Sequence, residues 1–402
     1  MATRDTNVNG MRTKVGIIGA GPSGLILAHL LRLEGIESVI IEARSREHCE
    51  QRARAGVLEH DTAALLERIG VGERMRREGL VHRGIFLRFN GRDHRIDFTD
   101  LTGGRSITVY GQHEVIKDLI AAALDAGQQL LFDVEDVSVD ELESRRPRIH
   151  FRRQSGAVTL ECDVIAGCDG FHGVCRPSIP NGALQSFDKT YPFAWLGILA
   201  AAPPASEELV YTRHERGFAL MSMRSPQITR LYLQVPPSTS LDEWPDDRIW
   251  TELRTRMATN EPWALCEGTI LQRSVTPMRG FVVDPMQYGR LYLVGDAAHI
   301  VPPTGAKGMN LAIADVRALA EALVAFYRDG SSELLGEYST TCLRRVWRVQ
   351  RFSAYMTRML HRASDDPFDD RVQLAELEYV TSSRAAAAAL AENYVGLPFD
   401  AR

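Results

Sequence analysis

The sequence lacks the features of membrane, secreted and nucleic-acid-binding proteins. No stretch approaches the roughly 18 apolar residues that a membrane span needs. The opening residues, MATRDTNVNGMRTK, contain no apolar core of a signal peptide. The formal net charge is −5, so there is no basic excess to attract nucleic acid. These absences predict a cytoplasmic protein that has neither a membrane nor a nucleic acid as a partner.

Paired cysteines and metal-ligand motifs are missing too. The six cysteines are scattered without a CxxC pair, which is typical of reduced, structural thiols. Nothing in the sequence calls for a metal, and we predict none. The 402 residues, 45% of them hydrophobic, are enough for two or three domains with substantial cores. Only one glycine-rich GxGxxG motif is present, near the start of the chain.

This GxGxxG motif lies in TKVGIIGAGPSGLILAHLLRLEGIESVIIEAR, which predicts a strand at 14–18, a helix and a second strand ending at Glu42. Gly19 would allow the tight turn, Gly21 the approach of a pyrophosphate, and Gly24 the packing of the helix on the strand. The Glu42 carboxylate would accept hydrogen bonds from a ribose. The alternative is a glycine-rich turn of structural importance only. The complete pattern favours an ADP-containing cofactor and leaves NAD or FAD open.

Two later stretches bear on that choice. CDVIAGCDGFHGVCR predicts a buried strand that ends near Asp169, and LYLVGDAAHIVPPTGAKGMN predicts a strand that ends near Asp296. Either one alone could be an ordinary turn. All three motifs in this order resemble the class A flavoprotein aromatic hydroxylases, in which the first motif binds FAD and the later two close on its riboflavin part.

The resemblance implies a set of residues for non-covalently bound FAD. Asp296 would hold the ribityl chain. The backbone N–H groups of Gly308, Met309 and Asn310, which open a helix, would face the pyrimidine end of the ring system and stabilise negative charge on reduced flavin. The resemblance places further residues at the cofactor, namely Ser23, Arg52, Arg54, Gln112 and Asp169.

Seven more stretches are similar to the branch of this family that hydroxylates 4-hydroxybenzoate: RARAGVLE, GLVHRG, TVYGQHEV, YPFAWLGILA, RGFALMSMRS, VPPTGAKGMNLA and AENYVGLP. The resemblance implies an α/β fold: a Rossmann-like FAD-binding domain of the glutathione-reductase type, an interleaved β-sheet substrate domain and a helical C-terminal region. The FAD-binding domain would be discontinuous and comprise residues 12–82, 108–185 and 277–315. The sheet domain would comprise residues 83–107 and 186–276, and the helical region residues 316–402.

Two predicted strands carry candidate substrate-binding residues. Ser222 and Arg224 are two apart, so on a strand they share a face, where Arg224 offers a bidentate fork for a carboxylate. Arg230 and Tyr232 alternate with leucines on the next strand. Patterning alone favours the solvated outer face of a sheet. The resemblance instead places Ser222, Arg224 and Tyr232 at the substrate carboxylate, with Met223 beside them, and gives Arg230 a role in flavin movement.

The phenol end of the substrate needs a proton path, because a phenol with a pKa near ~10 is mostly neutral at pH 7. The resemblance implies that Tyr211 touches the substrate oxygen and that Tyr394 lies behind it. His82 would pass the proton to water, as its near-neutral pKa suits it to do. The carbonyl group of Pro303 would lie near the same hydroxyl.

The nicotinamide nucleotide has no Rossmann motif of its own. Candidate phosphate contacts are Arg44, Arg46, Arg54, His172 and Arg279. The choice between NADH and NADPH stays open, because Ala43 occupies a position where the family often has arginine. A solvated charged helix is the alternative for Arg46.

The implied activity is an FAD-dependent monooxygenation with NAD(P)H and O2. A flavin C4a-hydroperoxide would hydroxylate 4-hydroxybenzoate ortho to its phenol, giving 3,4-dihydroxybenzoate. A substituted substrate, such as 3-amino-4-hydroxybenzoate in a biosynthetic pathway, is the alternative within the class. A flavin-dependent oxidase and a non-catalytic FAD-binding regulator would share the cofactor motifs. By family analogy, the segment RRVWRVQRFSAYMTRMLHR suggests homodimer contacts.

Overall fold

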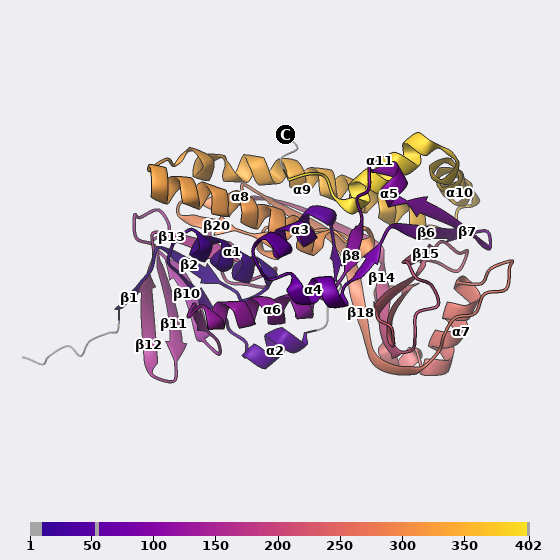
Figure 1. Cartoon of the computed structure of the whole chain (residues 1–402), viewed down its shortest axis with the longest axis horizontal. Helices are drawn as coiled ribbons and strands as arrows, with labels where there is room; N and C mark the ends of the chain where they lie inside the picture. Colours follow the sequence, from indigo (N-terminus) through magenta and orange to yellow (C-terminus); the bar gives the residue numbers. More distant parts are fainter. Residues whose placement is uncertain (1–9, 53–55, 400–402) are drawn as a thin grey trace, which may run out of the picture.

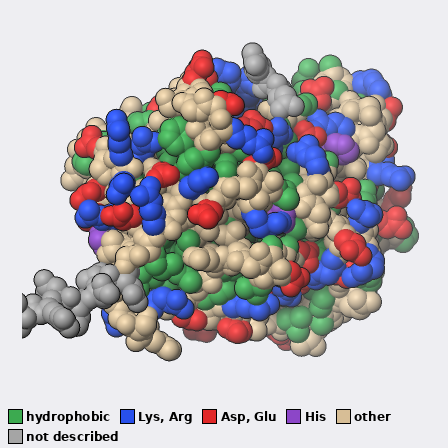
Figure 2. Space-filling model, turned by 60° about the vertical axis from the view of Figure 1, so that its left-hand side comes forward, with side chains coloured by type: hydrophobic (Ala, Val, Ile, Leu, Met, Phe, Trp, Pro, Cys, Tyr) green, Lys and Arg blue, Asp and Glu red, His purple; other side chains and the backbone are tan. Residues whose placement is uncertain are grey.

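The computed structural model describes residues 10–52 and 56–399. It confirms a mixed α/β fold with a helical C-terminal region (Figure 1). Figure 2 shows one face of the molecule, on which basic and acidic side chains are interspersed. No helix within the described ranges is both long and apolar enough to cross a membrane. All six cysteines lie in these ranges and are free thiols, as predicted.

A six-stranded sheet carries the cofactor motifs. Its order is β19 (Gln287–Tyr288), β20 (Leu291–Leu293), β13 (Val164–Gly167), β2 (Val15–Ile18), β3 (Ser38–Ile41) and β9 (Gln129–Leu131). The last five strands are parallel and β19 is antiparallel to β20. Strands β2, β13 and β20 are neighbours, and each runs into one of the three predicted motifs. The motifs therefore meet at the carboxyl edge of the sheet, where α/β folds bind nucleotides.

An eight-stranded sheet forms the second half of the molecule. Its order is β21 (His299–Ile300), β18 (Thr269–Asp284), β14 (Gln185–Ala201), β17 (Ile228–Val235), β16 (Ala219–Ser225), β15 (Val210–Thr212), β6 (Gly84–Phe89) and β7 (Arg92–Asp97). The long antiparallel strands β14 and β18 extend from this sheet toward the six-stranded one (Figure 1). The burial of β17 alternates residue by residue, as its sequence predicts.

The remaining strands of the described chain form two smaller sheets. One contains β1 (Gly10–Arg12), β12 (Gly156–Glu161), β11 (Arg148–Arg153) and β10 (Glu135–Asp140). The other contains β4 (Val57–Leu58), β8 (Ile107–Val109) and β5 (Leu80–His82). This second sheet holds His82 opposite Ile107.

Helices cover the sheets and fill the C-terminal region. Those nearest the cofactor edge are α1 (Pro22–Leu33), α6 (Gln112–Asp125) and α8 (Gly308–Asp329). The long helix α9 (Glu333–Leu360) lies along α8, and α10 (Pro367–Ser382) and α11 (Arg384–Val395) follow (Figure 1). The remaining helices are α2 (Arg46–Gln51), α3 (His60–Arg68), α4 (Glu73–Glu78), α5 (Phe98–Leu101) and α7 (Asp246–Arg256).

Elements cross the predicted domain boundaries. Strand β18 is continuous from Thr269 to Asp284, so there is no break at 276–277. Helix α8 begins at Gly308, so the predicted start of the helical region at 316 lies inside it. Both boundaries therefore fall inside single elements, and the division of the chain into domains stays a prediction.

Candidate active site

The first glycine-rich turn has the geometry that a nucleotide site needs. Gly19 has φ +108°, and a Cβ there would lie 2.4 Å from the carbonyl oxygen of Cys168. A Cβ on Gly24 would lie 2.0 Å from the carbonyl oxygen of Gly19. By contrast, a Cβ on Gly21 would meet no atom of the described residues within 4 Å. The turn is thus closely packed at Gly19 and Gly24 and open at Gly21, which fits the approach of a pyrophosphate to the N-terminus of α1.

Glu42 fixes the same turn. Its two carboxylate oxygens accept the backbone N–H groups of Ala20 and Arg44, each at 2.8 Å. A carboxylate oxygen can accept more than one hydrogen bond, so a ribose hydroxyl could still bind. The ribose contact of Glu42 stays a prediction, and its structural role was not part of the sequence interpretation.

Asp169 follows β13 and has one unsatisfied oxygen. Its Oδ2 accepts the backbone N–H of Cys175 at 2.8 Å. Its Oδ1 is buried and has no hydrogen-bond partner in the part of the chain that the structure describes. Burial raises the pKa of Asp169, against the opposing hydrogen bond from Cys175. A buried acceptor without a partner fits a donor group of a bound cofactor.

The first turn of α8, which follows the loop after β21, is anchored by the Asn310 side chain. Gly308, Met309 and Asn310 form the first turn of this helix, and a Cβ on Gly308 would meet no described atom within 4 Å. The Asn310 side chain accepts the N–H of Glu59 at 2.9 Å and donates to the carbonyl oxygen of Val57 at 2.9 Å. The helix N-terminus is therefore open at its end and anchored to β4 at its side.

A buried ion pair supports this loop. Lys307 Nζ donates to Glu59 Oε1 at 2.8 Å and to the carbonyl oxygen of Tyr394 at 2.7 Å. Burial lowers the pKa of Lys307, although Glu59 acts to raise it. The sequence patterns predicted no role for Lys307 or Glu59. The only signal was a lone lysine in a loop rich in glycine and proline.

The two predicted tyrosines meet in the interior. The hydroxyl oxygens of Tyr211, on β15, and Tyr394, on α11, lie 2.5 Å apart, and each side chain is 1% exposed. Burial raises the pKa of both, although the hydrogen bond from Tyr394 opposes the rise for Tyr211. The carbonyl oxygen of Pro303 accepts the N–H of Ala306 at 2.9 Å. Its predicted substrate contact would have to use the remaining lone pair.

His82 lines a pocket of about 600 Å³, here called the His82 pocket, which is formed by residues 79–82 and 204–207 with Met223, Ser225 and Pro226. The His82 side chain is 1% exposed, and neither ring nitrogen has a hydrogen-bond partner among the described residues. Burial lowers the pKa of His82 to about 4, against the opposing charge of Glu208. No direct hydrogen bond joins His82 to Tyr394 in the described chain.

Strands β16 and β17 bring the predicted carboxylate-binding residues together. Arg224 Nη1 donates to Ser222 Oγ at 2.9 Å, so the two side chains share a face as predicted. Arg224 donates to Ser222 and to the carbonyl oxygen of Met223 but forms no ion pair with an acidic side chain among the described residues, and burial lowers its pKa, an effect that Tyr232 opposes. An unpaired guanidinium in a partly buried place fits an anionic ligand. Met223 lines the His82 pocket instead, because successive side chains alternate between strand faces.

Arg230 and Tyr232 lie beside this cluster. The Arg230 guanidinium is 5.3 Å from the centroid of the Tyr232 ring. A Cβ on Gly197 would lie 2.7 Å from Arg230 Nη2, so the glycine makes room for this arginine. The Tyr232 ring also contacts Trp195, with centroids 4.7 Å apart. Trp195 Nε1 donates to His361 Nε2 at 2.6 Å, and burial lowers the pKa of His361 to about 3.

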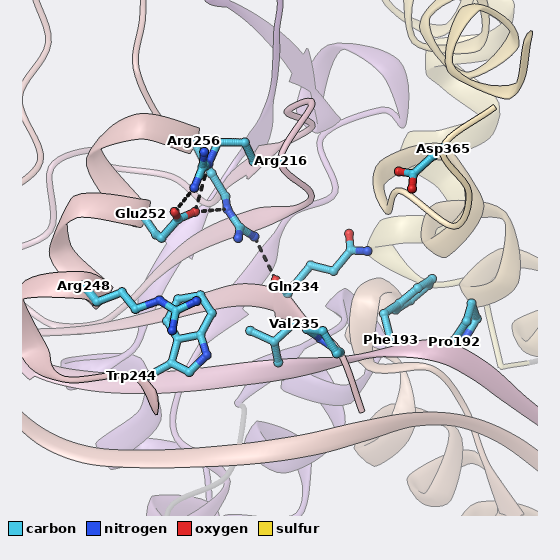
Figure 3. A pocket seen from close by; sticks show the side chains of 11 residues that line it. Pro192, Phe193, Arg216, Gln234, Val235, Trp244, Arg248, Glu252, Arg256 and Asp365 are labelled. Carbon is cyan, nitrogen blue, oxygen red and sulfur yellow. Dashed lines mark hydrogen bonds and ion pairs between the residues drawn. The ribbon is translucent and has the colours of Figure 1, made fainter. Parts of the chain in front are cut away.

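A second cavity of about 600 Å³ is lined by residues that include Phe193, Gln234 and Trp244 (Figure 3). Arg216 and Arg256 both bind Glu252 there, and Arg256 also donates to the carbonyl oxygen of Gln234 at 2.9 Å. The Phe193 ring forms part of the wall and stacks on His361. None of the predicted site residues lines this cavity, so it is distinct from the predicted substrate site.

The predicted nicotinamide contacts are less uniform. His172 and Arg279 both lie against the Phe171 ring, at 5.0 and 4.3 Å from its centroid, but Arg279 already forms an ion pair with Asp188. Arg46 forms an ion pair with Glu50 at 2.6 Å, as expected for a charged helix exposed to solvent.

The other predicted FAD residues lie on elements at the edge where the motifs meet. They are Ser23 on α1, Gln112 at the start of α6 and Asp296 after β20. Arg52 ends α2, and Arg54 lies outside the described residues.

The chain is similar to proteins of one enzyme family. Residues 12–353 match the family described as FAD binding domain. The p-hydroxybenzoate hydroxylase of Acinetobacter baylyi is 47% identical over 97% of this chain and 96% of its own length. The 3-amino-4-hydroxybenzoate 2-monooxygenase of Streptomyces cremeus is 25% identical over 90% of this chain and 91% of its own. The crystal structure of p-nitrophenol 4-monooxygenase PnpA from Pseudomonas putida DLL-E4 superposes with a TM-score of 0.83 at 19% identity, over 97% and 99% of the chains.

The fold and the motifs thus define an FAD-dependent aromatic monooxygenase. The chain belongs to the FAD binding domain family, among the class A flavoprotein aromatic hydroxylases. The crowded Gly19 turn, the open helix starts and the unpaired Asp169 oxygen fit FAD at the edge of the six-stranded sheet.

Proposed function

We propose that the enzyme hydroxylates 4-hydroxybenzoate at the carbon ortho to the phenol, with NADH or NADPH as electron donor. One arrangement carries the proposal: Arg224, which forms no ion pair, lies beside Ser222 on β16, and Tyr211 on the neighbouring strand β15 contacts Tyr394 of α11. The first cluster suits a carboxylate and the second suits a phenol. The p-hydroxybenzoate hydroxylase relative supports the same substrate.

Bound FAD would take electrons from the nicotinamide nucleotide and activate O2. The chain's own residues would orient the acid and manage its proton. Arg224, Ser222 and Tyr232 would hold the carboxylate. Tyr211 would accept a hydrogen bond from the phenol and pass its proton to Tyr394. Because burial keeps both tyrosines neutral, each can accept a proton on its oxygen only as it releases its own.

His82 would take the proton onward through a bridging water and release it into the His82 pocket. Its lowered pKa means that it cannot hold the proton near neutral pH, so it would act as a relay. Arg230 would respond to flavin movement, and Arg44, His172 and Arg279 would contact the nicotinamide nucleotide. For Arg279, this contact would replace the ion pair with Asp188.

A second candidate substrate is a 3-substituted 4-hydroxybenzoate, such as the 3-amino compound. The observation that favours it is the similarity to a 3-amino-4-hydroxybenzoate 2-monooxygenase, at 25% identity. A screen of benzoates for stimulated NADH and NADPH oxidation tests both, with the product identified by mass. Stimulation by 4-hydroxybenzoate with the gain of one oxygen atom supports the first proposal, and stimulation by the 3-amino compound alone supports the second.

We also propose a homodimer, but through a different helix than the sequence suggested. Most apolar residues of the segment 344–362 are buried within the chain itself. Helix α10 instead exposes Phe368, Val372 and Tyr379 on one face, with exposed fractions of 73%, 53% and 58%. Light scattering on the native protein and on Phe368→Glu would test this; a monomeric native protein would rule the dimer out.

A further inference from the structure

A buried ion pair lies directly beneath the turn that follows β20. Asp315, on α8, points its Oδ2 at this turn and accepts the N–H of Gly295 at 3.0 Å. The same oxygen lies 2.6 Å from His299 Nε2. The Asp315 and His299 side chains are 1% and 2% exposed. One carboxylate oxygen thus joins the turn, helix α8 and strand β21.

The turn needs such a lock because its backbone is unusual. Gly295 has φ +62°, and a Cβ there would lie 2.9 Å from Cβ of Ala312 and 3.1 Å from Oγ of Ser23. The turn is therefore clamped between α1 and α8. The next residue is Asp296, whose direction is set by the conformation of Gly295.

The histidine next to Asp315 can offset the cost of burying a negative carboxylate. A lone buried carboxylate is costly, and an imidazolium offsets that cost. Burial acts to lower the pKa of His299, but the carboxylates of Asp315 and then of Asp296 outweigh it and raise the pKa. His299 Nε2 lies 2.6 Å from Asp315 Oδ2, and the charge of Asp296 acts on the same imidazole. On the side of α9, burial and Asp315 keep the Cys342 thiol protonated by raising its pKa, so it adds no charge.

The pair also connects the two large sheets. His299 is part of β21, where it pairs with Val282 of β18 in the eight-stranded sheet. Asp315 is on α8, and Gly295 follows β20 of the six-stranded sheet. A shift of the eight-stranded sheet edge would therefore move the imidazole relative to the carboxylate beneath the turn.

We propose that Asp315 and His299 are a pair of positioning residues for FAD. Asp315 holds the Gly295 turn through its hydrogen bond to the Gly295 N–H, and His299 fixes Asp315 from the other side, so that Asp296, the next residue after Gly295, can face the ribityl chain. The inference rests on FAD binding at this turn, which the family match supports, and does not depend on which aromatic acid is the substrate.

The test is FAD binding to apoprotein, followed by flavin fluorescence, for wild type, Asp315→Asn, His299→Gln and the double variant. Each single change should raise the Kd for FAD at least about 10-fold, because it leaves one buried charge without its partner. The double variant should lose less than the product of the two single losses. The midpoint potential of the bound flavin should also shift in both single variants, which a loss of general stability would not cause.

A matched control is Glu252→Gln, which breaks a buried pair with Arg256 in the other half of the molecule. It should lower the melting temperature and leave the Kd for FAD within about 2-fold. If Asp315→Asn does not fold, His299→Gln decides alone, since glutamine can still donate to Asp315. Single variants with wild-type Kd, or losses that multiply independently, overturn the proposal. Apoprotein that binds FAD normally but oxidises NAD(P)H with no benzoate contradicts the proposed function instead.

Discussion

The hydroxyl oxygens of Tyr211 and Tyr394 lie 2.5 Å apart, although 183 residues separate the two tyrosines along the chain. Burial raises the pKa of both hydroxyls, so the two tyrosines form a neutral hydrogen-bonded pair in an apolar place, as the proposed proton path requires. Such a contact can move a proton without creating a long-lived buried charge, which would be costly there.

Tyr211→Phe should uncouple flavin reduction from hydroxylation. The phenylalanine ring keeps the packing and removes only the hydroxyl that favours the phenolate, and each pKa unit of lost ionisation is worth about 1.4 kcal/mol. NAD(P)H consumption should continue while hydrogen peroxide replaces the hydroxylated product. Both products should be measured together across pH. Wild-type coupling near neutral pH would remove Tyr211 from the proton path.

Arg224→Lys should weaken binding of the aromatic acid severely and leave FAD bound. Lysine keeps the charge but loses the planar fork, so a partly buried carboxylate would be poorly paired. Binding is measured by the change in the flavin spectrum during titration with the acid. An unchanged Kd would show that the carboxylate binds elsewhere.

The purified protein should contain one FAD per chain, released on denaturation. The three motifs meet at one edge of the six-stranded sheet, and the sequence shows no obvious pattern for covalent attachment. Absorbance of the supernatant after acid precipitation checks this. Flavin that stays with the precipitated chain would contradict the non-covalent mode.

Glu59→Gln should reduce the free energy of unfolding by about 3 kcal/mol or more, because it leaves the buried Lys307 ammonium without its partner. The exposed pair Arg46–Glu50 provides the control, since Glu50→Gln should cost less than about 0.5 kcal/mol. Urea unfolding followed by circular dichroism measures both. Equal, small effects would mean that the buried pair contributes nothing net.

The His299–Asp315 pair should make stability depend on pH in a defined direction. Despite burial, Asp315 and Asp296 raise the pKa of His299 above its unfolded value, so its contribution is complete below about pH 6.5 and is lost as pH rises through the raised pKa. The difference in unfolding free energy between wild type and His299→Gln should therefore shrink as pH increases above that point. A difference that grows with pH would mean that His299 is neutral in the folded protein.

Local signals in the sequence predicted much of this fold. The turn at Gly19, the start of α8 at Gly308 and the alternation along β17 depend on backbone sterics and on the two-residue strand period. The shared face of Ser222 and Arg224 follows from the same period. These features are written in short stretches, so they can be read without tertiary structure.

Features that depend on distant partners were missed. Lys307 and Glu59 are 248 residues apart, and the Arg279–Asp188 pair joins two strands of one sheet. His299 and Asp315 are closer in sequence, but only the packing of α8 against the turn brings them together. Burial and charge partners cannot be read from spacing, because the fold decides which side chains meet.

The position of Tyr394 near the C-terminal end of the chain, in α11, has a consequence for the folding of the newly made protein. The ribosome completes β15, with Tyr211, long before it makes α11, because 183 residues separate the two tyrosines. A nascent chain can therefore form both large sheets while the Tyr211 hydroxyl still has no tyrosine partner. Loss of α11 by premature termination or proteolysis would leave a protein that retains the glycine-rich turn at Gly19 and lacks Tyr394, the proposed proton acceptor. Under the proposed function, such a fragment would oxidise reduced nucleotide and release hydrogen peroxide instead of hydroxylated product.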